Sequence, residues 1–104
     1  MIGQLRIYTI NKGMMDGWLK LFWDEIAPRV SEVGIVVQSA WVDEEHEQFI
    51  WIRTFDDRED IEVKEATFYG SEWWNANVAH IRSHLARREI TVIEPFLPDG
   101  ATPQ

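Results

Sequence analysis

The sequence predicts an α+β domain in which strands and helices follow one another in the order βαββαβ. Short segments of alternating apolar and polar side chains, typical of strands, are separated by longer segments whose apolar residues recur every three or four positions, as on one side of a helix. The chain has 104 residues, of which 45% are hydrophobic and 27% are charged. This composition is typical of one globular domain.

The first strand and the first helix have the clearest patterns. Residues 4–10 alternate apolar and polar side chains and are rich in β-branched and aromatic types, which predicts a strand. The next apolar residues recur at helical spacing and predict a buried stripe, made of Met15, Trp18, Leu19, Phe22, Ile26 and Val30. Because Pro28 has no amide hydrogen, we expect this helix to kink or end near Ala27 and to finish by Gly34.

The middle of the chain predicts an antiparallel hairpin. Residues 34–42 and 47–55 are both rich in β-branched and aromatic side chains, as strands are. Residues 43–46 between them are polar and acidic, and are few enough to form the exposed tip of the hairpin.

The second helical crossover has two parts. Residues 56–65 predict a helix that begins with a capping box formed by Asp56 and Glu59. Ser71 follows a glycine that interrupts this helix, and we expect it to cap a further helix over residues 72–85.

The last predicted strand is short. It covers residues 90–94 and is closed by Pro95. The domain is therefore expected to span residues 1–96, and residues 97–104 have too little apolar content to pack firmly, which predicts a flexible C-terminal tail.

This order of elements is the split βαβ, or ferredoxin-like, arrangement, an antiparallel four-stranded sheet with helices on one face. In the third strand Ile50 and Ile52 point one way, while Phe49, Trp51 and Phe55 point the other way, so both faces of the sheet are predicted to be apolar. Helices can cover only one of them. We expect the other face to carry aromatic side chains from several strands and to be buried in a homodimer, against the sheet of a second copy.

Charge and composition disfavour several classes of protein. Ten basic and eighteen acidic side chains give a net charge of −8, which disfavours nucleic acid or an anionic membrane as a partner. The absence of cysteine excludes disulfides, thiolate metal sites and cysteine nucleophiles. No apolar segment approaches the roughly 20 residues of a membrane span. We therefore expect a cytoplasmic protein with no nucleic-acid partner and no membrane insertion.

Tryptophan is the most distinctive residue type, with six in the chain. In one interpretation these side chains fill the core and the dimer interface, since indole rings bury large areas. In the other, some of them wall a cavity for a flat apolar ligand, because small-molecule pockets are mostly aromatic. Trp51, Trp73 and Trp74 are the candidates for this second role.

Polar side chains on otherwise apolar strands indicate where such a pocket would lie. They are Arg6, Tyr8, Gln38 and Arg53. A buried arginine needs a partner. Arg53 either forms a structural ion pair, with the following helix or with the partner chain, or binds a ligand carboxylate or enolate through its fork of donors. Tyr8 either donates a hydrogen bond to the same ligand group or is a core residue with its hydroxyl at the rim.

His80 and His84 lie four residues apart and share a helix face, a spacing at which two imidazoles can bind one metal. No third ligand stands at an identifiable spacing. The pair is explained as surface histidines, because Arg82 and Arg87 stand beside them. We predict no metal site.

Three blocks of sequence resemble the NIPSNAP family. They are residues 6–13 (Arg-Ile-Tyr-Thr-Ile-Asn-Lys-Gly), residues 49–57 (Phe-Ile-Trp-Ile-Arg-Thr-Phe-Asp-Asp) and residues 66–73 (Ala-Thr-Phe-Tyr-Gly-Ser-Glu-Trp). The resemblance covers residues 4–95. It implies a ferredoxin-like protomer, a homodimer whose two sheets form a dimeric α+β barrel, and a pocket between sheet and helices in each protomer. It implies no settled activity.

The same superfamily includes haem-degrading mono-oxygenases, which use an Asn on the first strand with a Trp and a His on the helical crossover. Trp74 and His84 are similar to that pair in placement and separation, which makes His84 a further ligand-binding candidate. The Asn is missing from the middle of the strand, where Ile7 and Tyr8 stand. We therefore expect neither haem nor another cofactor.

Three functional hypotheses follow. The first is a NIPSNAP-like homodimer that binds a hydrophobic small molecule, with or without an anionic group, between sheet and helices. Arg53 and Tyr8 would hold its polar end, and the three candidate tryptophans would wall its apolar end. The second is a cofactor-independent mono-oxygenase or related enzyme in the same pocket. The third is a structural or assembly protein whose cavity is filled by its own side chains.

Overall fold

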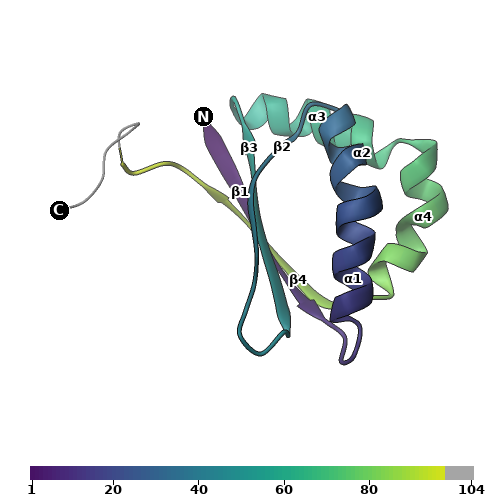
Figure 1. Cartoon of the computed structure of the whole chain (residues 1–104). Helices are drawn as coiled ribbons and strands as arrows, with labels where there is room; N and C mark the ends of the chain where they lie inside the picture. Colours follow the sequence, from purple (N-terminus) through teal and green to yellow (C-terminus); the bar gives the residue numbers. More distant parts are fainter. Residues whose placement is uncertain (98–104) are drawn as a thin grey trace.

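The computed structural model describes residues 1–97 and has the predicted α+β, ferredoxin-like fold (Figure 1). β1 to β4 form one antiparallel sheet in the order β2-β3-β1-β4, and the helices lie on one face of it. Along the chain the elements are β1 (Ile2–Ile10), α1 (Met15–Leu21), the π-helical turn η1 (Phe22–Ile26), α2 (Ala27–Glu32), β2 (Val36–Val42), β3 (Gln48–Phe55), α3 (Arg58–Tyr69), α4 (Glu72–Arg82) and β4 (Leu85–Ile93).

The first helix passes Pro28 without ending. In η1 the backbone N–H of Ala27 donates to the carbonyl of Phe22, five residues earlier. This wide turn directly precedes Pro28, which lies in the first turn of α2 and has no N–H to donate, so the helix changes its hydrogen-bond pattern at the proline and continues. An irregularity is therefore present where it was predicted, but an end near Ala27 is wrong. The chain leaves α2 through Gly34, whose φ of 83° suits glycine.

α3 begins one residue later than the predicted capping box. Its N-cap is Asp57, whose Oδ1 accepts a hydrogen bond from the N–H of Asp60 at 2.8 Å. The carboxylate of Asp60 accepts in turn from the N–H of Asp56 at 2.9 Å. The predicted pair of Asp56 and Glu59 is therefore wrong by one position, because acidic residues at the same spacing recur one residue further on.

The boundary between α4 and β4 also differs from the prediction. Ser71 caps α4 as predicted, accepting from the N–H of Trp74 at 3.1 Å. The helix ends at Arg82, however, and β4 starts at Leu85 rather than at residue 90. β4 is an edge strand whose first half is exposed, so its sequence lacks the alternation of apolar and polar residues that marks a half-buried strand. Its backbone pairing with β1 defines the strand instead.

The side of the sheet that faces the helices is aromatic. Phe49, Trp51 and Phe55 on β3 are buried there. The apolar stripe of the first helix packs onto them, with the ring of Trp18 edge-on to that of Phe49 at a centroid distance of 5.7 Å. Val30, on the same stripe, belongs to this core and is 0% exposed.

The opposite face of the sheet, here called the open face, is aliphatic. Leu5 pairs with Ile52 and Ile7 with Ile50 across β1 and β3. Among the described strands, Trp41 on β2, opposite Ile50, is the one aromatic side chain on this face. The second face is thus apolar as predicted, but aromatic residues from several strands are not found there, because those of β1 and β3 occupy the alternate positions that face the helices.

The predicted domain and tail, residues 1–96 and 97–104, divide near the end of the described chain, and residues 98–104 lie outside it. None of the helices in residues 1–97 is long and apolar enough to cross a membrane.

Replacing Val30 by Ala should lower the free energy of unfolding by about 2–3 kcal/mol, because it leaves a cavity in the packed core. Val63 on the outer side of α3 is 59% exposed, so Val63→Ala should change the same quantity by less than about 0.5 kcal/mol. Urea denaturation at one protein concentration measures both. Equal losses in the two variants would contradict this placement of the core.

Candidate functional site

A cluster of polar side chains lies among the aromatic residues on the helix-facing side of the sheet. Gln4, Arg6 and Tyr8 alternate along β1, so they point to the same face, and Arg53 on β3 stands opposite Gln4. Arg6 is 3% exposed and Arg53 is 1% exposed. A buried guanidinium is costly unless its charge is compensated. The neighbours of the two arginines therefore decide what the cluster can do.

One carboxylate serves both buried arginines. Glu65 on α3 approaches the sheet, and its Oε2 accepts from Nη2 of Arg6 at 3.0 Å and from Nη2 of Arg53 at 2.6 Å. The side chain of Glu65 is 23% exposed, so the two ion pairs lie at the edge of the buried region. The structural alternative for Arg53, an ion pair with the following helix, is present in this form.

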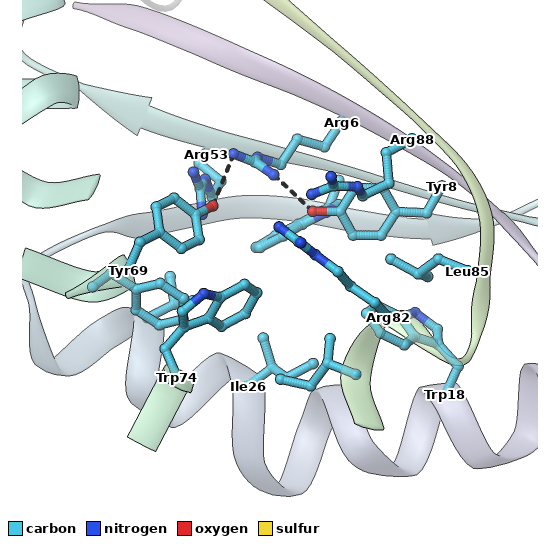
Figure 2. Close-up of a pocket in the computed structure, with 14 residues that line it drawn as sticks. Arg6, Tyr8, Trp18, Ile26, Arg53, Tyr69, Trp74, Arg82, Leu85 and Arg88 are labelled. Carbon is cyan, nitrogen blue, oxygen red and sulfur yellow. Dashed lines mark hydrogen bonds between the residues drawn. The ribbon is translucent and has the colours of Figure 1, made fainter. Parts of the chain in front are cut away.

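Neutral groups accept further hydrogen bonds from these arginines. Oε1 of Gln4 accepts from Nε of Arg6 at 2.8 Å, and from Nε and Nη2 of Arg53 at 2.9 and 2.7 Å. The hydroxyl oxygens of Tyr8 and Tyr69 accept from Arg6 at 2.8 and 3.1 Å, on either side of its guanidinium (Figure 2). We call these six residues, Gln4, Arg6, Tyr8, Arg53, Glu65 and Tyr69, the inner network. It ties β1, β3 and α3 together.

The inner network is cationic. Burial lowers the pKa of Arg53, and the nearby charge of Arg6 lowers it further, so this pKa lies below its ordinary value. Burial also lowers the pKa of Arg6, but Tyr8, Tyr69 and Glu65 more than offset that effect and hold it above its ordinary value. Arginine keeps its proton at neutral pH in either case. Two guanidinium charges therefore face one carboxylate.

A small cavity adjoins the inner network, between the sheet and the helices. Its volume of about 30 Å³ is room for about two water molecules. Apart from arginines, its wall is mostly aromatic and aliphatic and includes Tyr8, Trp18, Ile26, Val30, Trp51, Phe68, Ile81 and Leu85. The indole N–H groups of Trp18 and Trp51 have no acceptor among the described residues.

A wider cleft of about 350 Å³ adjoins the cavity near the end of α4. Cavity and cleft share the lining residues Arg6, Tyr69, Trp74, Arg82 and Arg88. Figure 2 shows the side chains of Arg82 and Arg88 reaching into the space beside Arg6. The two spaces are therefore two compartments of one pocket.

The pocket concentrates positive charge in an acidic protein. Arg6, Arg53, Arg82 and Arg88 are four of the seven arginines of the chain, whose net charge is −8. Glu65 is the one carboxylate among the described residues that line the two compartments. This local excess of positive charge favours an anion.

The structure brings four of the six predicted site residues together. Tyr8, Trp51, Arg53 and Trp74 all line the small cavity. Trp51 also lies beneath Arg53, whose Cζ is 5.2 Å from the centroid of the indole ring. A guanidinium held over an indole face is favourable. The aromatic and the polar candidates therefore belong to one site.

The other two predicted residues, Trp73 and His84, do not line the pocket. Trp73 lies against Arg29, whose Cζ is 5.3 Å from the ring centroid. His84 is buried beside Trp18, at a centroid distance of 6.0 Å, and its Nδ1 lies 3.0 Å from the carbonyl oxygen of His80. Residues 1–97 contain no group of three or more His, Cys, Asp or Glu side chains placed to hold a metal ion.

Three charged pocket residues, Glu65, Arg82 and Arg88, were not predicted from the sequence. Glu65 has no pattern that distinguishes it from the other acidic residues of its helix. A signal for Arg88 does exist once β4 is known to begin at Leu85. Arg88 then stands opposite Tyr8, and it alternates with Ile90 on the side of the strand that faces the helices.

Replacing Glu65 by Gln should lower the free energy of unfolding by about 3–5 kcal/mol, because it leaves two adjacent guanidinium groups buried without a carboxylate. Glu62 on the same helix is exposed, and Glu62→Gln removes the same charge at a cost below about 0.5 kcal/mol. Chemical denaturation measures the difference. If the two variants were equally stable, the inner network would not hold the fold together.

Comparison with known proteins agrees with this structure. The chain superposes on an uncharacterized NIPSNAP domain protein from Burkholderia xenovorans with a TM-score of 0.86 and 20% identity, over 95% of this chain and 100% of that one. A NIPSNAP family protein from Agrobacterium tumefaciens gives a TM-score of 0.83 and 22% identity, over 96% and 88%. An antibiotic biosynthesis monooxygenase gives 0.68 and 17% identity, over 94% and 100%.

At these identities the structural neighbours show the shared fold and nothing further. No curated protein matches the chain. The sequence model of the NIPSNAP family, however, matches residues 3–98, which is nearly the whole chain. The protein therefore belongs to the NIPSNAP family.

Proposed function

We propose that this protein is a homodimeric small-molecule-binding domain, whose pocket between sheet and helices takes an apolar ligand that carries an anionic group. The observation that carries the proposal is one pocket in which four arginines and one carboxylate adjoin a largely aromatic wall. Aromatic walls with a few placed polar groups are typical of small-molecule sites. Guanidinium groups bind oxyanions through paired hydrogen bonds.

The two compartments suit different parts of such a ligand. The cleft of about 350 Å³ is at the lower end of the range for ligand pockets, roughly 300–1,000 Å³. It offers the rings of Tyr69 and Trp74 for contact with a flat body. The cavity of about 30 Å³ admits only a small terminal group. This combined space favours ligand binding over the hypothesis of an interior filled by its own side chains.

Catalysis in the same pocket is the second candidate, as a cofactor-independent mono-oxygenase or related enzyme. It is favoured by the aromatic wall of the small cavity beside Tyr8, and by the likeness in fold to an antibiotic biosynthesis monooxygenase. The two candidates separate once a ligand is bound. Oxygen consumption that accompanies binding would favour the enzyme, and binding without consumption would favour the binding domain.

The homodimer rests on the chemistry of the open face. Leu5, Ile7, Ile50 and Ile52 form an aliphatic patch across the two central strands, and Trp41, which is 63% exposed, extends it to β2. A contiguous apolar patch is unfavourable in water. A second copy can cover it with the same patch about a two-fold axis. The pocket lies on the other side of the sheet and stays accessible in such a dimer.

Replacing Ile50 by Lys in this patch should convert the dimer into single chains, because it places a charge in an apolar interface. At micromolar concentration the unmodified protein should have twice the 12.2 kDa mass of one chain, and the variant the mass of one chain. Val63→Lys, on the outer side of α3, should remain dimeric. Analytical ultracentrifugation measures these masses. An unmodified protein that sediments as a single chain would contradict the proposed dimer.

The fluorescent dye 8-anilinonaphthalene-1-sulfonate tests the pocket, since it combines flat aromatic rings with an anionic group. One dye should bind per protomer, with a dissociation constant of about 10–100 μM for a ligand of this size. Ile90 lines the cleft and is 46% exposed, so Ile90→Trp should fill the cleft without unfolding the protein. It should weaken binding at least about tenfold, a loss of about 1.4 kcal/mol.

Val63→Trp is the matched control, because it adds the same indole to an exposed position outside the pocket. It should leave dye binding unchanged. Binding that is equally strong in both variants would place the dye elsewhere, and the absence of saturable binding to the unmodified protein would overturn the proposed function.

A further inference from the structure

We propose that Arg82 and Arg88, here called the mouth arginines, form the subsite for the anionic group of the ligand. The inference rests on the proposed function and adds which side chains hold the charge, a role that the sequence suggested for Arg53. The ligand class is a flat aromatic molecule with an oxyanion, such as a carboxylate, at its edge.

Neither mouth arginine has an acidic partner in residues 1–97. Within the described part of the chain, no ion pair joins Arg82 or Arg88 to a carboxylate. Arg82 makes one cation–π contact, with its Cζ at 5.9 Å from the ring centroid of Trp74. Both side chains are exposed. Their donors are therefore available to a ligand without the loss of an existing ion pair.

The buried arginines are in the opposite situation. Arg6 and Arg53 donate to Gln4 and share Glu65, with Arg6 also bonded to two tyrosines. An anion that took the place of Glu65 would break both ion pairs and would have to lose its hydration in a cavity of about 30 Å³. The inner network therefore suits a neutral polar atom, and the anion is better placed at the mouth.

The positions of the mouth arginines also suit an oxyanion. Arg82 is the last residue of α4, and Arg88 lies on β4 opposite Tyr8, so two elements bring them to one opening. Both line the cavity and the cleft, and Figure 2 shows both guanidinium groups in the space beside Arg6. Glu65 also lines the cleft but is paired with Arg6 and Arg53. Like charges that no ion pair offsets repel one another, and an oxyanion between Arg82 and Arg88 removes that repulsion. The ring of Trp74 then offers a surface for the aromatic body.

Two dyes with the same rings test the subsite. 8-Anilinonaphthalene-1-sulfonate carries a sulfonate, and N-phenyl-1-naphthylamine is its neutral counterpart. Each of Arg82→Gln and Arg88→Gln should weaken binding of the anionic dye about tenfold, as expected for a lost charge-assisted hydrogen bond. The double variant should bind the anionic dye more weakly than either single variant. None of the three variants should change binding of the neutral dye by more than about twofold. Arg82→Lys and Arg88→Lys should retain part of the preference for the anion.

Arg58→Gln is the charge-matched control, because Arg58 is exposed at the start of α3 and outside both compartments. It should leave the affinity for both dyes unchanged. The proposal is overturned if the double variant binds the anionic dye as tightly as the unmodified protein does, or if both dyes weaken equally. In either case, the proposed pocket would still be supported if Ile90→Trp abolished the binding of both dyes. If the unmodified protein binds neither dye, both proposals fail.

Discussion

Two guanidinium groups buried on one face of a small sheet constrain the rest of this structure. Arg6 and Arg53 stand on neighbouring strands, and neither can stay there without compensation, because an unpaired buried charge costs about 3–5 kcal/mol. The carboxylate comes from Glu65, which requires α3 to lie across β1 and β3 with that residue turned inward. Gln4 accepts from both arginines and so depends on the observed strand register. A slip by one residue would turn these groups to the open face.

The two faces of the sheet can therefore serve different purposes. The helix-facing side carries the inner network and the aromatic residues, whereas the open face is aliphatic. A second copy on the open face does not compete with a ligand on the other side. For the proposed ligand, the charge distribution would add selectivity, since a net charge of −8 repels anions in general while the pocket arginines attract them locally.

Features that depend on residues close together in the sequence could be predicted from it. Features that depend on how separate strands and helices pack together could not. The cap at Ser71 and the alternation of side chains along β3 follow from spacings of two to four residues, whereas the face that carries Trp51 and Arg53 does not. The choice of Asp57 as a cap was missed because several acidic residues share that spacing. Arg53 stood out as a charge within an apolar strand, whereas Arg82 and Arg88 lie in exposed, charged sequence. They line the pocket because β4 pairs with β1, which places Arg88 opposite Tyr8, and because α4 ends beside the same cavity.

The most direct test of this account is the rate at which the arginine Nε protons exchange with water, measured by ¹⁵N nuclear magnetic resonance and assigned with single Arg→Lys variants. The Nε–H groups of Arg6 and Arg53 are donated to Gln4, so their protons should exchange at least about a hundredfold more slowly than those of Arg82 and Arg88. Equal exchange at all four arginines would show that the inner pair is not held in a buried network and would contradict the account.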